Sequence, residues 1–142
     1  MIDNKVTLYG VGKLGLCFAL NLERAGFDVL GVDVDNDYVN SINTKSLVSA
    51  EESVNELLKE TSNFRATLDP VAGLDHSDTL FVFVATPSIP TSGKYDHSQI
   101  HSLVEELKAE GIQPTLKDLI IGCTVMPGFC DRIQEELRDY NY

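Results

Sequence analysis

The chain has 142 residues, of which 22 are acidic and 11 are basic, so its formal net charge at neutral pH is −11. This length fits a single domain, and a composition of 43% hydrophobic and 23% charged residues excludes a disordered or fibrous chain. An acidic chain repels the phosphates of nucleic acids and of anionic membranes, so neither is an expected partner.

Cysteine usage and the N-terminus bear on the cellular compartment. Cys17, Cys123 and Cys130 are odd in number and lie outside any CxxC spacing, which fits reduced thiols. The N-terminus lacks a signal-peptide pattern, and no apolar run approaches the roughly 18 residues that a membrane span needs. We therefore expect a cytoplasmic protein without a membrane segment.

Strand and helix patterns alternate along the chain. In order, we expect a strand at 6–9, a helix at 14–25, a strand at 29–34, helices at 36–43 and 50–60, and a strand at 65–68. The second half continues with a strand at 79–85, a polar loop to about residue 95, a helix from about residue 96, a strand at 119–123 and a helix that opens at Pro127. Ser49 followed by Glu52 fits a capping box for the helix at 50–60.

This alternation indicates βαβ units and a parallel sheet. The expected fold is α/β, a Rossmann-type doubly wound parallel sheet that forms one domain over residues 1–142, with strand order 3-2-1-4-5-6. The last helix ends near Asp139 and should lead into a sixth strand. The chain is therefore expected to lack the last strand of the sheet.

A glycine-rich segment lies between the first strand and the first helix. It forms a GxGxxG pattern made of Gly10, Val11, Gly12, Lys13, Leu14 and Gly15. The first glycine allows a tight turn, the second lets the backbone approach a pyrophosphate, and the third lets the helix pack on the strand. The pyrophosphate then meets unpaired N–H groups at the positive end of the helix dipole.

An acidic residue follows at the spacing that a dinucleotide site requires. Asp33 ends the second strand, 18 residues after Gly15, where a carboxylate hydrogen-bonds the adenosine ribose 2′-hydroxyl of NAD. Asp33 and the nearby Asp35 would repel the 2′-phosphate of NADP. The alternative is that Asp33 only ends a strand and begins a turn. The sequence thus predicts a site for NAD.

Two more loops follow strand ends. One contains Thr86 and Pro87 and then the run 93–96, Gly-Lys-Tyr-Asp, and the other is the run 123–129, which contains Thr124. Together with the glycine loop, its following Leu16 and Asp33, these motifs resemble the N-terminal domain of the UDP-glucose/GDP-mannose dehydrogenase family. Glu51, followed by Glu-Leu-Leu at 56–58, is also similar to a family stretch, so the resemblance covers nearly the whole chain.

The resemblance implies the NAD-binding domain of a nucleotide-sugar 6-dehydrogenase of polysaccharide biosynthesis. Such an enzyme oxidises the C6 alcohol of a UDP- or GDP-linked sugar to a carboxylate, with two hydride transfers to NAD. The resemblance places Thr86 and Thr124 along the nicotinamide half of the cofactor, and Pro87 is also expected among the cofactor-binding residues. The alternative role for both threonines is local turn bonding, which loop hydroxyls commonly make.

The resemblance also says what this chain lacks. The family's catalytic cysteine and its helpers belong to segments that would lie beyond Tyr142, so no catalytic residue is expected here, and the nucleotide sugar is expected to bind through other domains. A homodimer would be a property of the full-length protein. The chain departs from the family pattern in four places: Tyr38, where Arg or Lys is common, Cys123, where Ser is usual, the pair 129–130, and the segment 51–54, which lacks the Pro-Gly of the family stretch.

Other interpretations stay open. His76, His97 and His101 match no metal-ligand spacing, so no metal site is expected. The chain could instead be a self-standing dinucleotide-binding or regulatory module without hydride chemistry. It could also be the N-terminal domain of another β-hydroxyacid-type dehydrogenase.

Overall fold

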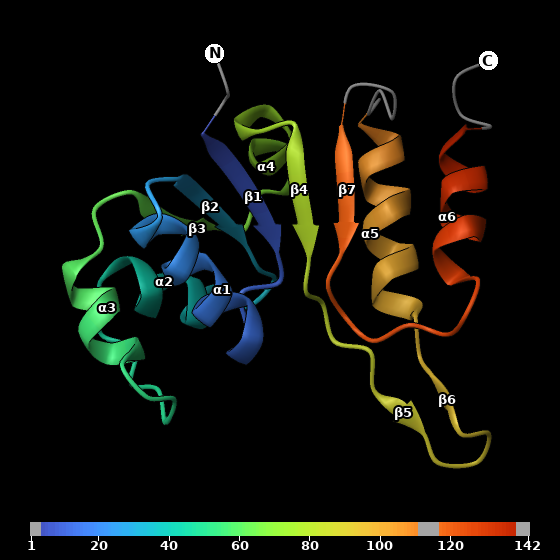
Figure 1. Ribbon diagram of the computed structural model, residues 1–142, viewed down its shortest axis with the longest axis horizontal. Helices are drawn as coiled ribbons and strands as arrows, with labels where there is room; N and C mark the ends of the chain where they lie inside the picture. The colour runs from blue at the N-terminus through green and yellow to red at the C-terminus, as the bar shows by residue number, and fades with distance from the viewer. Residues whose placement is uncertain (1–3, 111–116, 139–142) are drawn as a thin grey trace.

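The computed structural model describes residues 4–110 and 117–138, and a five-stranded parallel sheet forms its centre (Figure 1). The strands are β1 (Lys5–Tyr9), β2 (Asp28–Val32), β3 (Phe64–Thr67), β4 (Thr79–Val82) and β7 (Asp118–Ile121). They lie in the order β3-β2-β1-β4-β7, and each neighbouring pair of this sheet is parallel. The doubly wound fold and the order of its first five strands are thus confirmed. The sequence predicts that the chain lacks a sixth strand after the last helix, and the residues that follow this helix lie outside the described ones.

Helices pack on both faces of the sheet. On one face lie α1 (Lys13–Arg24), α2 (Asn36–Asn43) and α3 (Val54–Glu60). On the other face lie α4 (Pro70–His76) and α5 (Ser98–Ala109), and α6 (Phe129–Arg138) packs against α5. Right-handed crossovers explain the division, because the chain runs outward from β1 in one direction to β3 and in the other to β7.

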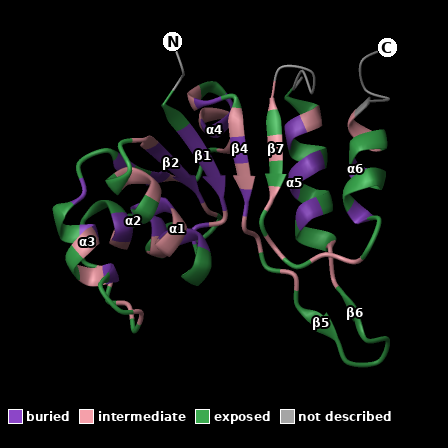
Figure 2. Cartoon of the chain, in the orientation of Figure 1, coloured by how far each residue is buried: buried purple, intermediate pink, exposed green. Residues whose placement is uncertain are grey.

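The central strand β1 contributes to the core on both faces, because successive side chains of a strand point to opposite sides. Val6 and Leu8 pack with α1, α2 and α3, whereas Tyr9 packs on the side of α4 and α5. Figure 2 shows the buried residues concentrated on β1, β2 and the inner sides of the helices. The buried hydroxyl of Thr7 donates to Gly73 O at 2.8 Å, and the phenol of Tyr9 donates to Pro70 O at 2.9 Å. These bonds satisfy the polar atoms that β1 buries under α4.

The start of α3 differs from the prediction. The helix begins at Val54 rather than near residue 50, and the capping box is wrong. The preceding Ser53 has φ 63°, a left-handed conformation that no helix continues through. The Ser49 hydroxyl accepts the N–H of Glu51 at 3.1 Å and so closes a local turn instead of capping a helix.

Two elements are absent from the sequence prediction. Helix α4 is one of them, although Asp69 accepts the Val71 N–H at 2.9 Å and Pro70 is its first residue, a recognised signal for a helix start. The other is a two-stranded antiparallel hairpin, β5 (Ser88–Ile89) and β6 (Lys94–Tyr95), within the expected polar loop. The hairpin projects beyond the carboxyl ends of β4 and β7 (Figure 1).

Several other boundaries shift by a few residues. Strands β2, β4 and β7 end at Val32, Val82 and Ile121, before the expected ends, and α6 begins at Phe129 rather than Pro127. The residues freed in this way form the loops at the carboxyl edge of the sheet. Within the described part of the chain, no helix combines the length and apolar character that a membrane crossing requires.

Candidate dinucleotide-binding site

The predicted cofactor residues lie at the carboxyl ends of four neighbouring strands. Residues 10–15 connect β1 to α1, Asp33 follows β2, Thr86 and Pro87 follow β4, and Thr124 follows β7. Because these strands are parallel, the segments lie along one edge of the sheet, in the order Asp33, glycine loop, Thr86 and Thr124. This edge contains the point between β1 and β4 where the strand order reverses, which is where ligands bind in open α/β sheets.

The glycines let α1 start very close to the sheet. Gly10 has φ 88°, and a Cβ there would lie 2.8 Å from the carbonyl carbon of Phe83. A Cβ at Gly15 would collide with the carbonyl oxygen of Gly10. Gly12 differs from both: it precedes the first residue of α1, and a Cβ there would meet no atom within 4 Å. No side chain caps this end of α1, so its first N–H groups are left for an anion to bind.

The carboxylate of Asp33 is held beside the glycine loop. Its Oδ2 accepts the N–H of Val11 at 3.1 Å, and its Oδ1 accepts the N–H groups of Val34 at 2.8 Å and Asp35 at 3.2 Å. An ionised carboxylate offers about four acceptor positions, so one is left for a ligand hydroxyl. Asp33 therefore does organise a turn, but that role leaves it able to bind a ribose as well.

Tyr38 contacts the glycine loop in a way that sequence reasoning missed. Its half-buried phenol donates to Val11 O at 2.7 Å, and its N–H donates to Asp35, the N-cap residue of α2, at 3.0 Å. Burial and the nearby negative charge of Asp33 raise the pKa of Tyr38 to about 12, so the phenol stays a donor at neutral pH. The signal in the sequence was an aromatic residue five positions after Asp33.

An ion pair crosses from the glycine loop to the segment before α3. Lys13 Nζ lies 2.8 Å from Glu51 Oε1, and this hydrogen bond raises the pKa of Lys13. Because the lysine is 80% exposed, the pair adds little stability. It does place the Glu51 carboxylate beside the start of α1. Leu14, the next residue of the loop, is 62% exposed.

The loop threonines have free hydroxyls. Thr86 is half-buried and Thr124 is exposed, and neither hydroxyl makes a hydrogen bond within residues 4–110 and 117–138. The local turn bonding that was the alternative role for these side chains is therefore not seen. The carbonyl of Pro87 accepts the N–H of Asp96 at 2.8 Å, which closes the base of the hairpin.

The cysteines and histidines of the described segments lie in different surroundings. Cys17 packs against the core, Cys130 is exposed, and burial raises the pKa of the Cys123 thiol. No group of three or more histidine, cysteine or acidic side chains in those segments could hold a metal ion. His97 precedes α5, and its ring centre lies 4.1 Å from that of Phe129.

Comparison with known proteins agrees with this geometry. The model of the UDP-glucose/GDP-mannose dehydrogenase family, NAD binding domain, matches residues 4–141. An uncharacterised protein of Methanocaldococcus jannaschii is 33% identical over 140 residues, which cover 96% of this chain and 15% of that protein. A UDP-N-acetyl-D-mannosamine dehydrogenase of the same organism is 29% identical over 144 residues, which cover 96% of this chain and 32% of the enzyme.

A solved structure shows the same arrangement. The ternary complex of GDP-mannose dehydrogenase from Pseudomonas aeruginosa superposes with a TM-score of 0.82 and 25% identity, over 95% of this chain and 32% of that one. The chain spans about a third or less of the length of each of these relatives. It belongs to the UDP-glucose/GDP-mannose dehydrogenase family and corresponds to the NAD-binding domain of that family.

Proposed function

We propose that this chain is the cofactor-holding domain, over residues 1–142, of a nucleotide-sugar dehydrogenase that oxidises the C6 alcohol of a UDP- or GDP-linked sugar to a carboxylate. The observation that carries the proposal is the uncapped start of α1 at Gly12, next to the carboxylate of Asp33. Together they offer N–H donors to a pyrophosphate and an acceptor to a ribose hydroxyl, the two kinds of group that a dinucleotide-binding βαβ unit supplies.

Each segment of the edge has a role in this proposal. The loop backbone holds the pyrophosphate, Asp33 binds the adenosine ribose, and the loops after β4 and β7 line the nicotinamide half. The residues assigned to NAD are Gly10, Val11, Gly12, Lys13, Leu14, Gly15, Asp33, Thr86, Pro87 and Thr124. The unbonded hydroxyls of Thr86 and Thr124 support the nicotinamide assignment.

Bound NAD would accept the hydride that leaves the sugar carbon. This chain would position the ring that receives the hydride, whereas the groups that bind the sugar and complete the oxidation would come from segments of a longer protein. The relatives named above are all much longer than this chain. We therefore propose that the 142 residues alone bind NAD without oxidising sugars, that a homodimer forms only in the full-length protein, and that the enzyme acts in cytoplasmic polysaccharide biosynthesis.

Titration of the chain with NADH, followed by nicotinamide fluorescence, tests the proposal that the chain binds NAD. We expect saturable binding that NAD displaces and that NADP displaces much less effectively. A chain that shows a folded circular dichroism spectrum but no binding at millimolar NADH would refute it. A second sample with NAD and UDP-glucose or GDP-mannose should form no NADH. NADH formation by this chain would refute the proposal that the oxidation needs segments of a longer protein.

A further inference from the structure

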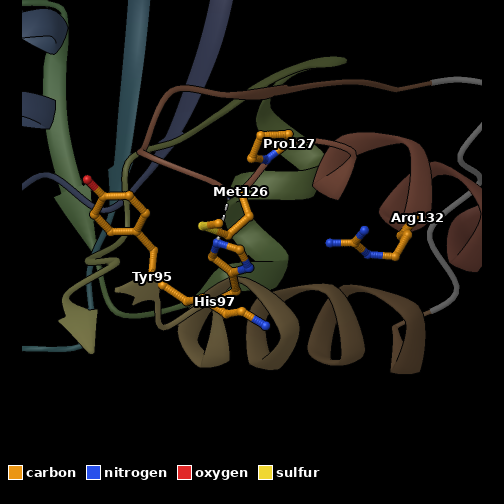
Figure 3. Close-up of a pocket in the computed structure, with 6 residues that line it drawn as sticks. Tyr95, His97, Met126, Pro127 and Arg132 are labelled. Carbon is orange, nitrogen blue, oxygen red and sulfur yellow. Dashed lines mark hydrogen bonds between the residues drawn. The ribbon is translucent and has the colours of Figure 1, made fainter. Parts of the chain in front are cut away.

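The loop between β7 and α6, which contains Thr124, is held by the side chain of His97, the residue before α5. The Nε2 atom of His97 accepts the backbone N–H of Met126 at 3.3 Å. Figure 3 shows this bond beside a hollow of about 340 Å³, whose lining residues are Lys94, Tyr95, His97, Met126, Pro127 and Arg132. An imidazole from one segment thus fixes the backbone of another, two residues from Thr124.

The rest of this loop is tethered mainly at its two ends. Gly122, its first residue, donates to the end of β4 at 2.9 Å, and its last residues lead into α6. Within residues 4–110 and 117–138, the bond to His97 is the only hydrogen bond that joins residues 123–128 to the sheet, the hairpin or α5. Val125 adds apolar packing. The hollow leaves the loop room to move if the bond is lost.

The bond requires a neutral imidazole. A ring nitrogen that accepts a hydrogen bond carries no proton, so the proton of the neutral His97 ring lies on Nδ1. When the ring gains a second proton, Nε2 becomes a donor and faces the N–H of Met126, which is also a donor. The protonated ring therefore cannot hold the loop.

The charges around His97 set the pH at which the ring gains this proton. Partial burial lowers the pKa of His97 below its ordinary 6.5, and the positive charges of His101 on α5 and Arg132 on α6 lower it further, against an opposing effect of Asp96. Two further charged groups lie nearby, Lys94 in the wall of the hollow and Glu136, whose carboxylate is 3.9 Å from His101. The ring is therefore neutral at pH 7.5 and becomes charged in mildly acidic solution.

We propose that His97 is a positioning residue for the nicotinamide half of the cofactor site and makes NAD binding sensitive to mild acid, a proposal that rests on the proposed function. The neutral ring holds the β7–α6 loop, and with it Thr124, where the cofactor needs it. The protonated ring releases the loop, so NAD loses contacts at its nicotinamide end. The glycine loop and Asp33 lie at least two strands away along the edge and keep their contacts.

Calorimetry with two ligands tests the proposal. NAD occupies the whole site, whereas ADP-ribose has the same adenosine and pyrophosphate but lacks the nicotinamide ring. The chain is titrated with each ligand at several pH values between about 7.5 and 5, a range that includes the ordinary histidine pKa. We expect the Kd for NAD to rise about two- to tenfold across this range, the size of one lost hydrogen bond. The Kd for ADP-ribose should stay nearly constant.

Three variants separate the acceptor, the ring and the charge. His97→Gln keeps an acceptor but gains no proton, so it should bind NAD as the wild type does at pH 7.5 and keep that affinity at lower pH. His97→Phe keeps a ring against Phe129 but has no acceptor, so it should bind NAD about two- to tenfold more weakly at every pH. His101→Gln is the matched control. It should keep the pH dependence, with an onset at slightly higher pH, because it removes a charge that lowers the pKa of His97.

The outcomes separate this proposal from the proposed function. If neither ligand binds the folded chain at pH 7.5, the proposed function fails. If both bind and the Kd for NAD does not change with pH, the role of His97 fails while the cofactor site stands. An equal loss of ADP-ribose affinity in acid would overturn the proposal, because the effect would then lie in the other half of the site. A pH dependence that persists in His97→Gln would overturn it as well. Unchanged ADP-ribose binding in the variants confirms that they are folded.

Discussion

The phenol of Tyr38 donates a 2.7 Å hydrogen bond to the carbonyl oxygen of Val11, the residue between the first two glycines of the loop. Asp33 accepts the N–H of the same residue at 3.1 Å. The Val11 side chain is fully buried, and a Cβ on Gly31 would lie 2.6 Å from it. Val11 is therefore held at its N–H, its carbonyl and its side chain. A loop fixed in this way loses little conformational freedom when a ligand binds, which favours affinity.

Tyr38→Phe tests this contact, because it removes the hydroxyl and keeps the ring. We expect the Kd for NADH to rise about two- to tenfold, since one hydrogen bond contributes about 0.5–1.5 kcal/mol. Tyr9→Phe is the matched control: it removes the phenol bond to Pro70 on the other face of the sheet, and should lower the melting temperature without changing the Kd. Equal effects of the two variants on NADH affinity would contradict a role for Tyr38 in positioning the loop.

Gly12→Ala separates folding from cofactor binding. Gly12 has φ −64° and open space around its Cβ position, so alanine fits the native backbone and the melting temperature should fall little or rise. The added methyl group would occupy the room that the pyrophosphate needs, and NADH affinity should fall by more than about tenfold. Fluorescence titration and thermal melts measure the two effects. Wild-type affinity in this variant would place the pyrophosphate elsewhere.

Asp33→Asn tests the choice between NAD and NADP. The amide keeps an acceptor oxygen but removes the charge that repels a 2′-phosphate, so NAD should bind more weakly and NADP relatively better. We expect the Kd for NADP divided by the Kd for NAD to fall at least about tenfold, because hydrogen bonds to charged groups contribute about 1.5–3 kcal/mol. Asp35→Asn removes the same charge two residues further on and should change the ratio less. An unchanged ratio in Asp33→Asn would mean that Asp33 only organises the turn.

Glu51→Gln should strengthen NADH binding. The Glu51 carboxylate lies beside the start of α1 and neutralises Lys13 at 2.8 Å, so it opposes the approach of a pyrophosphate. Removing its charge frees Lys13, and the Kd should fall about two- to threefold at low salt, the size of an exposed ion-pair effect. The gain should shrink at high salt, where exposed charges are screened. The exposed Glu52, next in the chain, provides the control Glu52→Gln. The same gain in that variant would show that the effect comes from net charge alone.

The pH dependence of stability should report the His97 contact. Partial burial, His101 and Arg132 lower the pKa of His97 below its ordinary 6.5, against a smaller opposing effect of Asp96. Below about pH 6.5 the unfolded chain therefore binds more protons at this residue than the folded chain, and the contribution of His97 to the free energy of unfolding declines as pH falls. His97→Phe, which keeps a ring against Phe129, should show a weaker decline in urea titrations between about pH 7.5 and 5. An equally steep decline in that variant would assign the effect to other groups.

The limits of sequence-based prediction are clear in α4. Gly73 lies inside this helix although glycine disfavours a helix interior by intrinsic propensity. A Cβ on Gly73 would lie 2.8 Å from the Tyr9 phenol oxygen, so glycine is what allows α4 to pack directly on β1. Tertiary packing stabilises this short helix, and no local pattern records that packing.

The sequence by itself determined the doubly wound sheet, the glycine loop and the position of Asp33, because strand periodicity and glycine spacing are local properties of the chain. The ordered set of loop motifs carried the resemblance to the family. Only the tertiary structure decided which side chains meet at the edge of the sheet. Tyr38 reaches Val11 across 27 residues, Glu51 pairs with Lys13, and His97 accepts the N–H of Met126 across 29 residues. These contacts depend on how the loops after β1, β2, β4 and β7 converge, and convergence follows from the strand order rather than from any single segment.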